Sequence, residues 1–247
     1  MYTFGRGFSG IPPVVKNIIL INIVMLLATY TAAAVFNSNL TAALGLYFPR
    51  SEHFRPYQII THMFMHGGLA HLFFNMFALF MFGRVLEAVW GPRRFFIYYF
   101  VSGLGAALTH EAVLAIQYQK IIGAIGPDQL EIVLDRGAEI WQTGRNFTDP
   151  DMRQLNMLLN IPTVGASGAV FGILLAFGVL FPNTRLMLLF PPIPIKAKWL
   201  VIGYGALELY LAVTQPGSNI AHAAHLGGMI FGYLLIRLWK KTTNTFY

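Results

Sequence analysis

Long apolar runs, separated by short polar stretches, recur along the whole chain. A helix needs about 20 mostly apolar residues to cross the hydrocarbon core of a membrane, and most of these runs approach that length. They lack the strict alternation of membrane-spanning strands. The pattern therefore predicts an all-α, polytopic membrane protein in which residues 1–247 form one membrane domain. Six transmembrane helices are expected at residues 18–36, 70–88, 95–116, 166–181, 199–214 and 221–239.

The composition agrees with a protein embedded in a lipid bilayer. Charged residues make up 11% of the chain and hydrophobic residues 56%, whereas a soluble domain carries about 25% charged residues. The sequence has no cysteine, which excludes disulfides, a cysteine nucleophile and thiolate metal sites. The net charge of +7 would suggest nucleic acid for a soluble protein. Basic cytoplasmic loops explain that charge here, so we expect no nucleic-acid partner.

The charges between the spans predict the orientation. If the N-terminus is cytoplasmic, most Lys and Arg residues fall inside, as the positive-inside rule requires. Most acidic residues then lie outside, in the loop of residues 117–161. We therefore expect an integral, multi-pass protein of a cell inner or plasma membrane with both termini in the cytoplasm. The first span also loosely matches a signal peptide ending at Ala32-Ala33-Ala34, but its length favours a retained helix.

The outer loop, residues 117–161, contains two patterns typical of short amphipathic helices. One begins at Pro127, a residue suited to the first position of a helix, and the other begins at Asp149-Pro150. The expected apolar stripes are Leu130, Leu134, Ala138 and Trp141 on the first helix, and Met152, Leu155 and Leu159 on the second. Such helices either lie on the outer membrane surface or pack on the bundle, and the sequence favours neither.

Few polar residues interrupt the spans, and each requires an explanation because polar groups are costly in lipid. His71 and Asn75 lie one helical turn apart on the second span. Ser167 begins the fourth span, which is only about 22 Å long, against a hydrocarbon core of about 30 Å. Irregular backbone at that depth must be covered by protein or water. We therefore expect a water-filled cavity that opens to the outer side and has Ser167 on its floor.

Small residues recur every fourth position on two spans and predict that these two helices pack closely. The two stripes are Gly168, Gly172 and Ala176 on the fourth span, and Ala224, Gly228 and Gly232 on the sixth. Close packing would bring the hydroxyl of Ser167 to the imidazole of His225, a base able to take its proton. No acidic residue lies within ten positions of either, so the sequence favours a dyad. His71, Asn75 and the backbone N–H of Ser167 are candidate donors to an oxyanion.

Three motifs occur in order on spans two, four and six: His71-x-x-x-Asn75, Gly165-Ala166-Ser167-Gly168, and Ala224-His225-x-x-Gly228-x-x-x-Gly232. Together they resemble the motifs of the rhomboid intramembrane serine proteases, over residues 57–232. The resemblance implies a six-helix rhomboid-like bundle. It also implies an endopeptidase that hydrolyses peptide bonds in or near transmembrane segments of its protein substrates, with neither a cofactor nor a metal ion.

The resemblance also assigns roles to single residues. It makes Ser167 the nucleophile and His225 the general base, with an oxyanion hole formed by Asn75, His71, Gly165 and the amide of Ser167. Supporting roles fall on Phe171, which would stack on the catalytic imidazole, and on Gly228, Gly232, His222 and the structural Glu87. The first loop, residues 37–66, departs from the family because Tyr57-Gln58 replaces a common Trp-Arg pair. Residues 214–220 correspond to a cap over the site.

Two other functions compete with proteolysis. One is a catalytically inactive rhomboid-like protein that binds membrane clients, although such proteins lack the Ser or the His that this chain has. The other is a metal or proton transporter, since His62 with His66 and His222 with His225 have the spacing of metal ligands. That reading leaves the serine motif unexplained. For His62, His66 and Glu208 a structural role is favoured.

Overall fold

The computed structural model describes residues 10–187, 192–214 and 221–242, and the fold is mostly helical. The first part contains α1 (Pro13–Phe36), α2 (Leu40–Leu44), α3 (Gln58–Thr61), η2 (His62–Phe64), α4 (Leu69–Ala78), the π-helical turn η3 (Leu79–Gly83) and α5 (Arg84–Ala124). The second part contains α6 (Pro127–Gln142), α7 (Pro150–Asn160), α8 (Ser167–Leu180), β1 (Arg185–Met187), β2 (Pro194–Lys196), α9 (Ala197–Thr214) and α10 (His222–Thr242). The segment 215–220, which contains most of the expected cap, lies outside the described residues.

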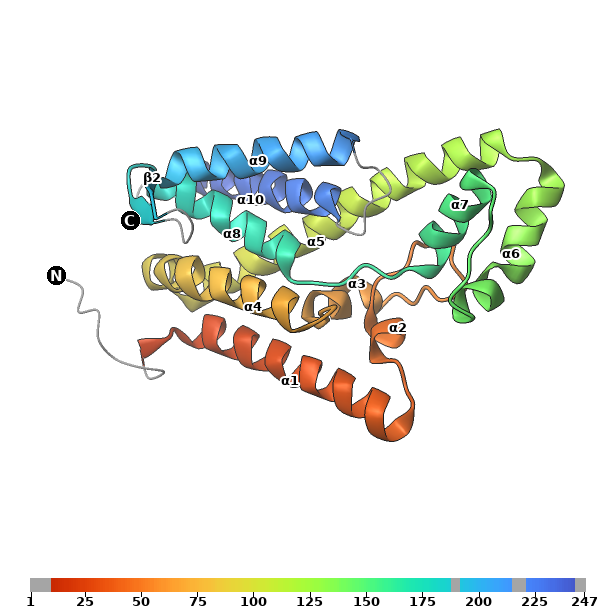
Figure 1. Cartoon of the computed structure of the whole chain (residues 1–247). Coiled ribbons are helices and arrows are strands. Elements are labelled where there is room, and N and C mark those ends of the chain that lie inside the picture. Colours follow the sequence, from red (N-terminus) through yellow and green to blue (C-terminus); the bar gives the residue numbers. More distant parts are fainter. Residues whose placement is uncertain (1–9, 188–191, 215–220, 243–247) are drawn as a thin grey trace.

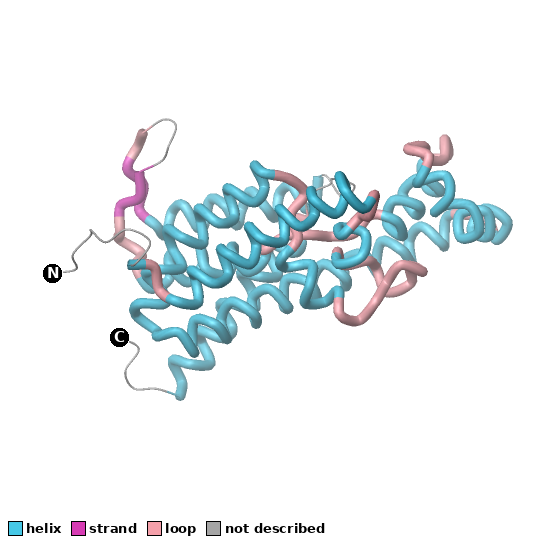
Figure 2. The backbone as a smooth tube through the Cα atoms, turned by 90° about the horizontal axis from the view of Figure 1, so that it is seen from below, coloured by secondary structure: helices cyan, strands magenta, loops and turns pink. Residues whose placement is uncertain are grey.

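The long helices form a bundle, with the pair α6 and α7 at one end of it (Figure 1). At the other end α1 begins, α10 ends and the antiparallel hairpin β1–β2 lies (Figures 1 and 2). Helix α10 packs on α5, α8 and α9, while α1 packs on α4 and α5. The basic hairpin and the acidic pair α6 and α7 therefore lie at opposite ends of the bundle.

Two helical stretches are long and apolar enough to cross a membrane by length and composition. They are Pro13–Phe36 and Leu69–Ala124. The second contains a kink at Gly91, whose positive φ of 77° is followed by Pro92, so it consists of two helical parts joined at the kink. Helix α8 is apolar but has only 14 residues, or about 21 Å at 1.5 Å per residue. The described helices cover most of each of the six expected ranges, and the number of membrane crossings stays a prediction.

The third expected span ends later than the sequence suggested. The polar residues Gln117 and Lys120 lower the hydropathy beyond residue 116, yet α5 continues to Ala124. The helix continues because Ile121 packs into a second apolar cluster, called the outer cluster below, which lies against α6 and α7. The members of this outer cluster are Phe48, Ile121, Val133, Met152, Leu155, Leu158 and Leu159.

The buried face of α6 differs from the expected stripe. Leu134 is 55% exposed and Trp141 37% exposed, whereas Val133 is 2% exposed and Gly137 is buried. Gly137 lies against the side chain of Asn156 on α7, which leaves no room for a larger residue. Helix α6 therefore packs on α7, and it turns Leu134 and Trp141 outward.

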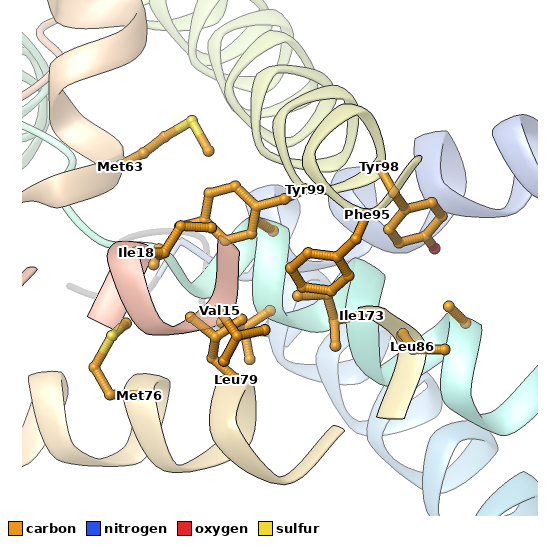
Figure 3. Packing of buried hydrophobic residues seen from close by; sticks show 14 of the residues in the cluster. Val15, Ile18, Met63, Met76, Leu79, Leu86, Phe95, Tyr98, Tyr99 and Ile173 are labelled. Carbon is orange, nitrogen blue, oxygen red and sulfur yellow. The ribbon is translucent and has the colours of Figure 1, made fainter. Parts of the chain in front are cut away.

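The main core lies between α1, α4, α5 and α8 and is closed by aromatic residues of α5 (Figure 3). Val15, Leu79, Phe95 and Ile173 are fully buried there. Glu87 holds the start of α1 in this core, because its carboxylate accepts the N–H groups of Val14 at 2.9 Å and Val15 at 2.8 Å. A helix N-terminus has free N–H groups, so this buried carboxylate serves as its cap.

The outer faces of the helices are strongly apolar. Large hydrophobic side chains more than half exposed include Val24 and Leu27 on α1, Phe73 and Phe74 on α4, Leu209 and Val213 on α9, and Leu234 and Leu238 on α10. Soluble monomers rarely expose apolar patches of this extent. The described surface therefore fits helices that face lipid.

Gln58 anchors the first loop. The motif resemblance would place a Trp-Arg pair where this chain has Tyr57-Gln58. The side chain of Gln58 is buried, and Oε1 accepts the N–H of Arg55 at 3.0 Å. The amide nitrogen donates to the carbonyl oxygens of His53 at 3.0 Å and Ala43 at 3.3 Å. Gln58 therefore ties α3 to both sides of the loop through its side-chain amide.

We expect Gln58→Ala to destabilise the protein by about 1–3 kcal/mol, because the mutation leaves buried carbonyl and N–H groups without partners. Thermal unfolding in detergent micelles measures the change as a lower Tm. Gln142→Ala is the matched control, because Gln142 is exposed at the end of α6 and should leave the Tm unchanged. Equal Tm values for the two variants would show that Gln58 does not anchor the loop.

Candidate active site

Ser167 and His225 face each other at the starts of two helices. Ser167 is the first residue of α8, and His225 lies in the first turn of α10. The hydroxyl oxygen of Ser167 is 2.8 Å from Nε2 of His225, a hydrogen-bonding distance. The side chain of His225 is 10% exposed, and Ser167 is half-buried. A hydroxyl and a mostly buried base therefore meet where the hydroxyl remains accessible from the cavity.

Backbone contact between α8 and α10 brings the two side chains together. A Cβ atom at Gly228 would collide with the carbonyl oxygen of Gly168, so no larger residue fits. Farther along, the hydroxyl of Tyr98 donates to the carbonyl oxygen of Gly172 at 2.8 Å and would also block a side chain at Gly232. The small-residue stripes thus form the contact that the sequence predicted.

Phe171 fixes the plane of the His225 ring. The two rings stack with centroids 4.2 Å apart and an angle of 8° between their planes. Phe171 lies one turn after Ser167 on α8, so one helix carries both the serine and the ring that supports its partner.

Gly165 allows His71 to approach the site. Its φ of 128° lies in the region that favours glycine, and its N–H donates to the carbonyl oxygen of His62 at 2.9 Å. A Cβ atom at Gly165 would lie 2.9 Å from the ring of His71 and 3.7 Å from the hydroxyl oxygen of Ser167. The glycine therefore places backbone beside both side chains.

Asn75 and His71 lie on α4, which begins at Leu69, close to the expected start of the second span at residue 70. The amide nitrogen of Asn75 is 3.2 Å from Nε2 of His66, and it carries two protons. One proton can bond to His66 while the second remains available. His66 is buried, and its ring lies 5.0 Å from that of His71. The structural role expected for His66 thus becomes specific: it orients Asn75.

The polar side chains of the site line a cavity of about 760 Å³. Among the residues that line it are His71, Asn75, Ser167, Phe171 and His225. Its outer wall comes from α7, through Arg153, Gln154, Met157 and Leu158. The sequence did not predict this contribution of α7 to the cavity.

Glu208 makes a second group with the two histidines of α10. It is 7% exposed, and Oε2 accepts a hydrogen bond from Nδ1 of His222 at 2.6 Å. Its other oxygen, Oε1, lies 3.1 Å from Nδ1 of His225, within ion-pair distance but off the line of a straight hydrogen bond. The sequence alone does not reveal this contact, because Glu208 lies on α9 and more than ten positions from His225. The sequence signal for this contact is Glu208 itself, because an acidic residue inside an apolar span needs a polar partner.

Of the two histidine pairs considered as metal ligands, His62 and His66 have separate partners, whereas His222 and His225 stay together beside Glu208. Nδ1 of His62 lies 2.9 Å from the carbonyl oxygen of Gln58, and His66 contacts Asn75. Within the described part of the chain, the one group with three potential metal ligands is Glu208, His222 and His225. That group is already joined by direct contacts between its own side chains.

The chain belongs to the rhomboid family, since the family model for the Rhomboid domain matches residues 53–241. Among curated proteins it is 30% identical to "Rhomboid protein 1, mitochondrial" of Saccharomyces cerevisiae, over 71% of this chain and 40% of the yeast protein. It is 30% identical to "RHOMBOID-like protein 12, mitochondrial" of Arabidopsis thaliana, over 70% and 44%. It is 28% identical to "Rhomboid protease AarA" of Providencia stuartii, over 70% and 52%. The chain spans about half the length of these relatives, and the resemblance expected from the motifs is confirmed.

Proposed function

We propose that this protein is an intramembrane serine endopeptidase that cleaves transmembrane protein substrates. The observation that carries the proposal is the 2.8 Å contact between the hydroxyl of Ser167 and Nε2 of His225, in a chain of the rhomboid family. A relative named as a protease supports it, as does the presence of both the serine and the histidine. An inactive client-binding protein has no need of that contact.

In the proposed reaction, Nε2 of His225 takes the hydroxyl proton of Ser167 while the oxygen attacks the substrate carbonyl. The new C–O bond pushes the carbonyl electrons onto oxygen, giving a tetrahedral oxyanion. His225 then gives the proton to the leaving amine as the C–N bond breaks, which leaves an acyl-enzyme. Water hydrolyses the acyl-enzyme by the same proton transfers. Phe171, stacked on the ring, keeps Nε2 directed at the hydroxyl throughout.

The side chains that we propose as donors for the oxyanion line the same cavity as Ser167. The donors are the second amide proton of Asn75, a ring N–H of His71 and the backbone N–H of Ser167 at the start of α8. Donors of this kind lower the barrier by roughly 3–4 kcal/mol each. Gly165 leaves the space for His71, and His66 orients Asn75, so the donors are held in place before the substrate binds.

The membrane setting of the proposal follows from helix lengths. Since α8 covers about 21 Å, a span ending at the inner boundary of a hydrocarbon core of about 30 Å would begin well below the outer surface. The cavity then supplies water to that depth, from the side where α6 and α7 lie. We propose six spans, with both termini cytoplasmic and the cavity open to the outer side.

The experiment that tests the function is reconstitution of the purified protein into liposomes with a single-span substrate. We expect two fragments, and mass spectrometry should place the cut in or near the transmembrane segment. Recovery of intact substrate only, from protein that is folded and correctly inserted, would contradict the proposal. The transporter alternative is tested on the same vesicles, in which external zinc should not accumulate.

We also expect Met157→Trp to reduce kcat/KM for a transmembrane substrate about 10-fold, because the larger side chain narrows the cavity beside α7. Labelling of Ser167 by a small fluorophosphonate should stay close to the wild-type rate, since that reagent needs less room. Leu134→Trp is the matched control, because Leu134 on α6 faces outward. Equal loss of cleavage and labelling in Met157→Trp would point to general disruption.

A further inference from the structure

Glu208 is a buried carboxylate that faces two imidazole rings from the neighbouring helix. One oxygen bonds to Nδ1 of His222 at 2.6 Å, and the other lies 3.1 Å from Nδ1 of His225. A buried charge is strongly unfavourable unless opposite charge or hydrogen-bond donors surround it. The two rings supply those donors, so the carboxylate is directed at the proposed base from the side opposite Ser167.

The contacts at the two nitrogens of His225 are consistent with only one neutral form of the ring. A neutral imidazole carries a proton on one nitrogen and a lone pair on the other. Nε2 lies 2.8 Å from the serine hydroxyl, and it must hold the lone pair if it is to accept the hydroxyl proton. Nδ1 then carries the proton and faces Oε1 of Glu208. A carboxylate at this position favours the form of the ring that can act as a base.

From these contacts we infer that Glu208 is a positioning residue for His225, which makes the proposed dyad a triad with its acid on α9. The inference rests on the proposed function. When His225 takes the proton of Ser167, the ring becomes an imidazolium, and Glu208 balances its charge in a setting of low polarity. Glu208 stays ionised and accepts no proton, so the proton remains on Nε2 until the leaving amine takes it.

His222 orients the carboxylate. Its 2.6 Å hydrogen bond to Oε2 restricts rotation of the carboxyl group and keeps Oε1 toward His225. His222 lies one turn before His225 on α10, so a single helix presents both rings to Glu208. The 3.1 Å contact is not well aligned, and catalytic hydrogen bonds of this kind often tighten when substrate binds.

The test compares Glu208→Asp and Glu208→Gln with the wild type in liposomes, measuring kcat and KM for a single-span substrate. Glutamine keeps the shape and one acceptor but loses the charge, whereas aspartate keeps the charge on a shorter side chain. If Glu208 balances charge, kcat falls on the order of 100-fold in Glu208→Gln and clearly less in Glu208→Asp. KM should change less than about 2-fold, because Glu208 lies outside the cavity lining.

The maximal rate of fluorophosphonate labelling of Ser167 should fall in parallel with kcat. Glu111→Gln is the control, since Glu111 on α5 also has buried carboxyl oxygens but does not line the cavity. It should retain wild-type kcat, and thermal unfolding checks that all variants are folded.

Three results would overturn the inference. The first is a wild-type kcat in Glu208→Gln. The second is a lower kcat in Glu208→Asp than in Glu208→Gln, because that order would indicate that only the shape of the side chain matters. The third concerns metal binding. Loss of wild-type activity on treatment with a chelator, together with one bound metal ion per chain, would make the cluster a metal site. If the wild type neither cleaves nor reacts with the fluorophosphonate, the proposed function fails, and the inference fails with it.

Discussion

Ser167→Ala is expected to abolish cleavage of a single-span substrate, with kcat reduced on the order of 10⁴-fold or more, to the background of the assay. The substitution removes the oxygen that would form the acyl-enzyme and leaves His225 without a proton to take. Alanine is a good helix former, so α8 should still begin at this position. Fragment formation in liposomes, followed by mass spectrometry, measures the effect.

Ser38→Ala is the matched control, because Ser38 is exposed beyond the end of α1. Both variants should unfold at the wild-type temperature, which separates loss of chemistry from loss of structure. Cleavage by Ser167→Ala at the wild-type rate would disprove the assignment of the nucleophile.

His225→Ala is expected to remove labelling of Ser167 by a serine-reactive fluorophosphonate, in addition to cleavage. The reagent reports on the hydroxyl itself, so it tests whether the imidazole activates the serine apart from any effect on substrate binding. The loss should be at least about 10³-fold, since the remaining hydroxyl has no other base within hydrogen-bonding distance in the described residues. Gel fluorescence after a timed reaction measures the rate.

His53→Ala provides the comparison for His225→Ala, because His53 lies in the first loop and away from the cavity lining. It should label as fast as the wild type. If His225→Ala labelled at the same rate as His53→Ala, the general base would have to be another group.

The positions of the long helices along the chain were predictable because apolar runs of about 20 residues are typical of membrane-spanning helices. The close contact between α8 and α10 was also predictable, since glycines at every fourth position have few other uses in a span. The proximity of Ser167 to His225 follows from that contact, because the two residues lie beside the small-residue stripes. By contrast, α5 extends past residue 116 because of the outer apolar cluster, and hydropathy does not register such tertiary packing.

The contact between Glu208 and His225 was harder to predict because it joins separate helices. Helix periodicity fixes which residues share one helix face, but it says nothing of the rotation of α9 relative to α10. The same limit applies to α7, whose side chains line the cavity from beyond the bundle. Its starting signal at Asp149-Pro150 was visible, and the direction in which the helix faces was not.

The contact between Gly168 and Gly228 has a consequence for how the protein tolerates mutation. Main-chain atoms determine the spacing of α8 and α10 there, so the distance between the backbones that carry Ser167 and His225 depends little on how the surrounding side chains pack. Substitutions elsewhere in the core can change the thermal stability while that distance stays the same. At Gly228 a substitution would change both the stability and that distance. One added methyl group would push α8 and α10 apart and so separate Ser167 from His225.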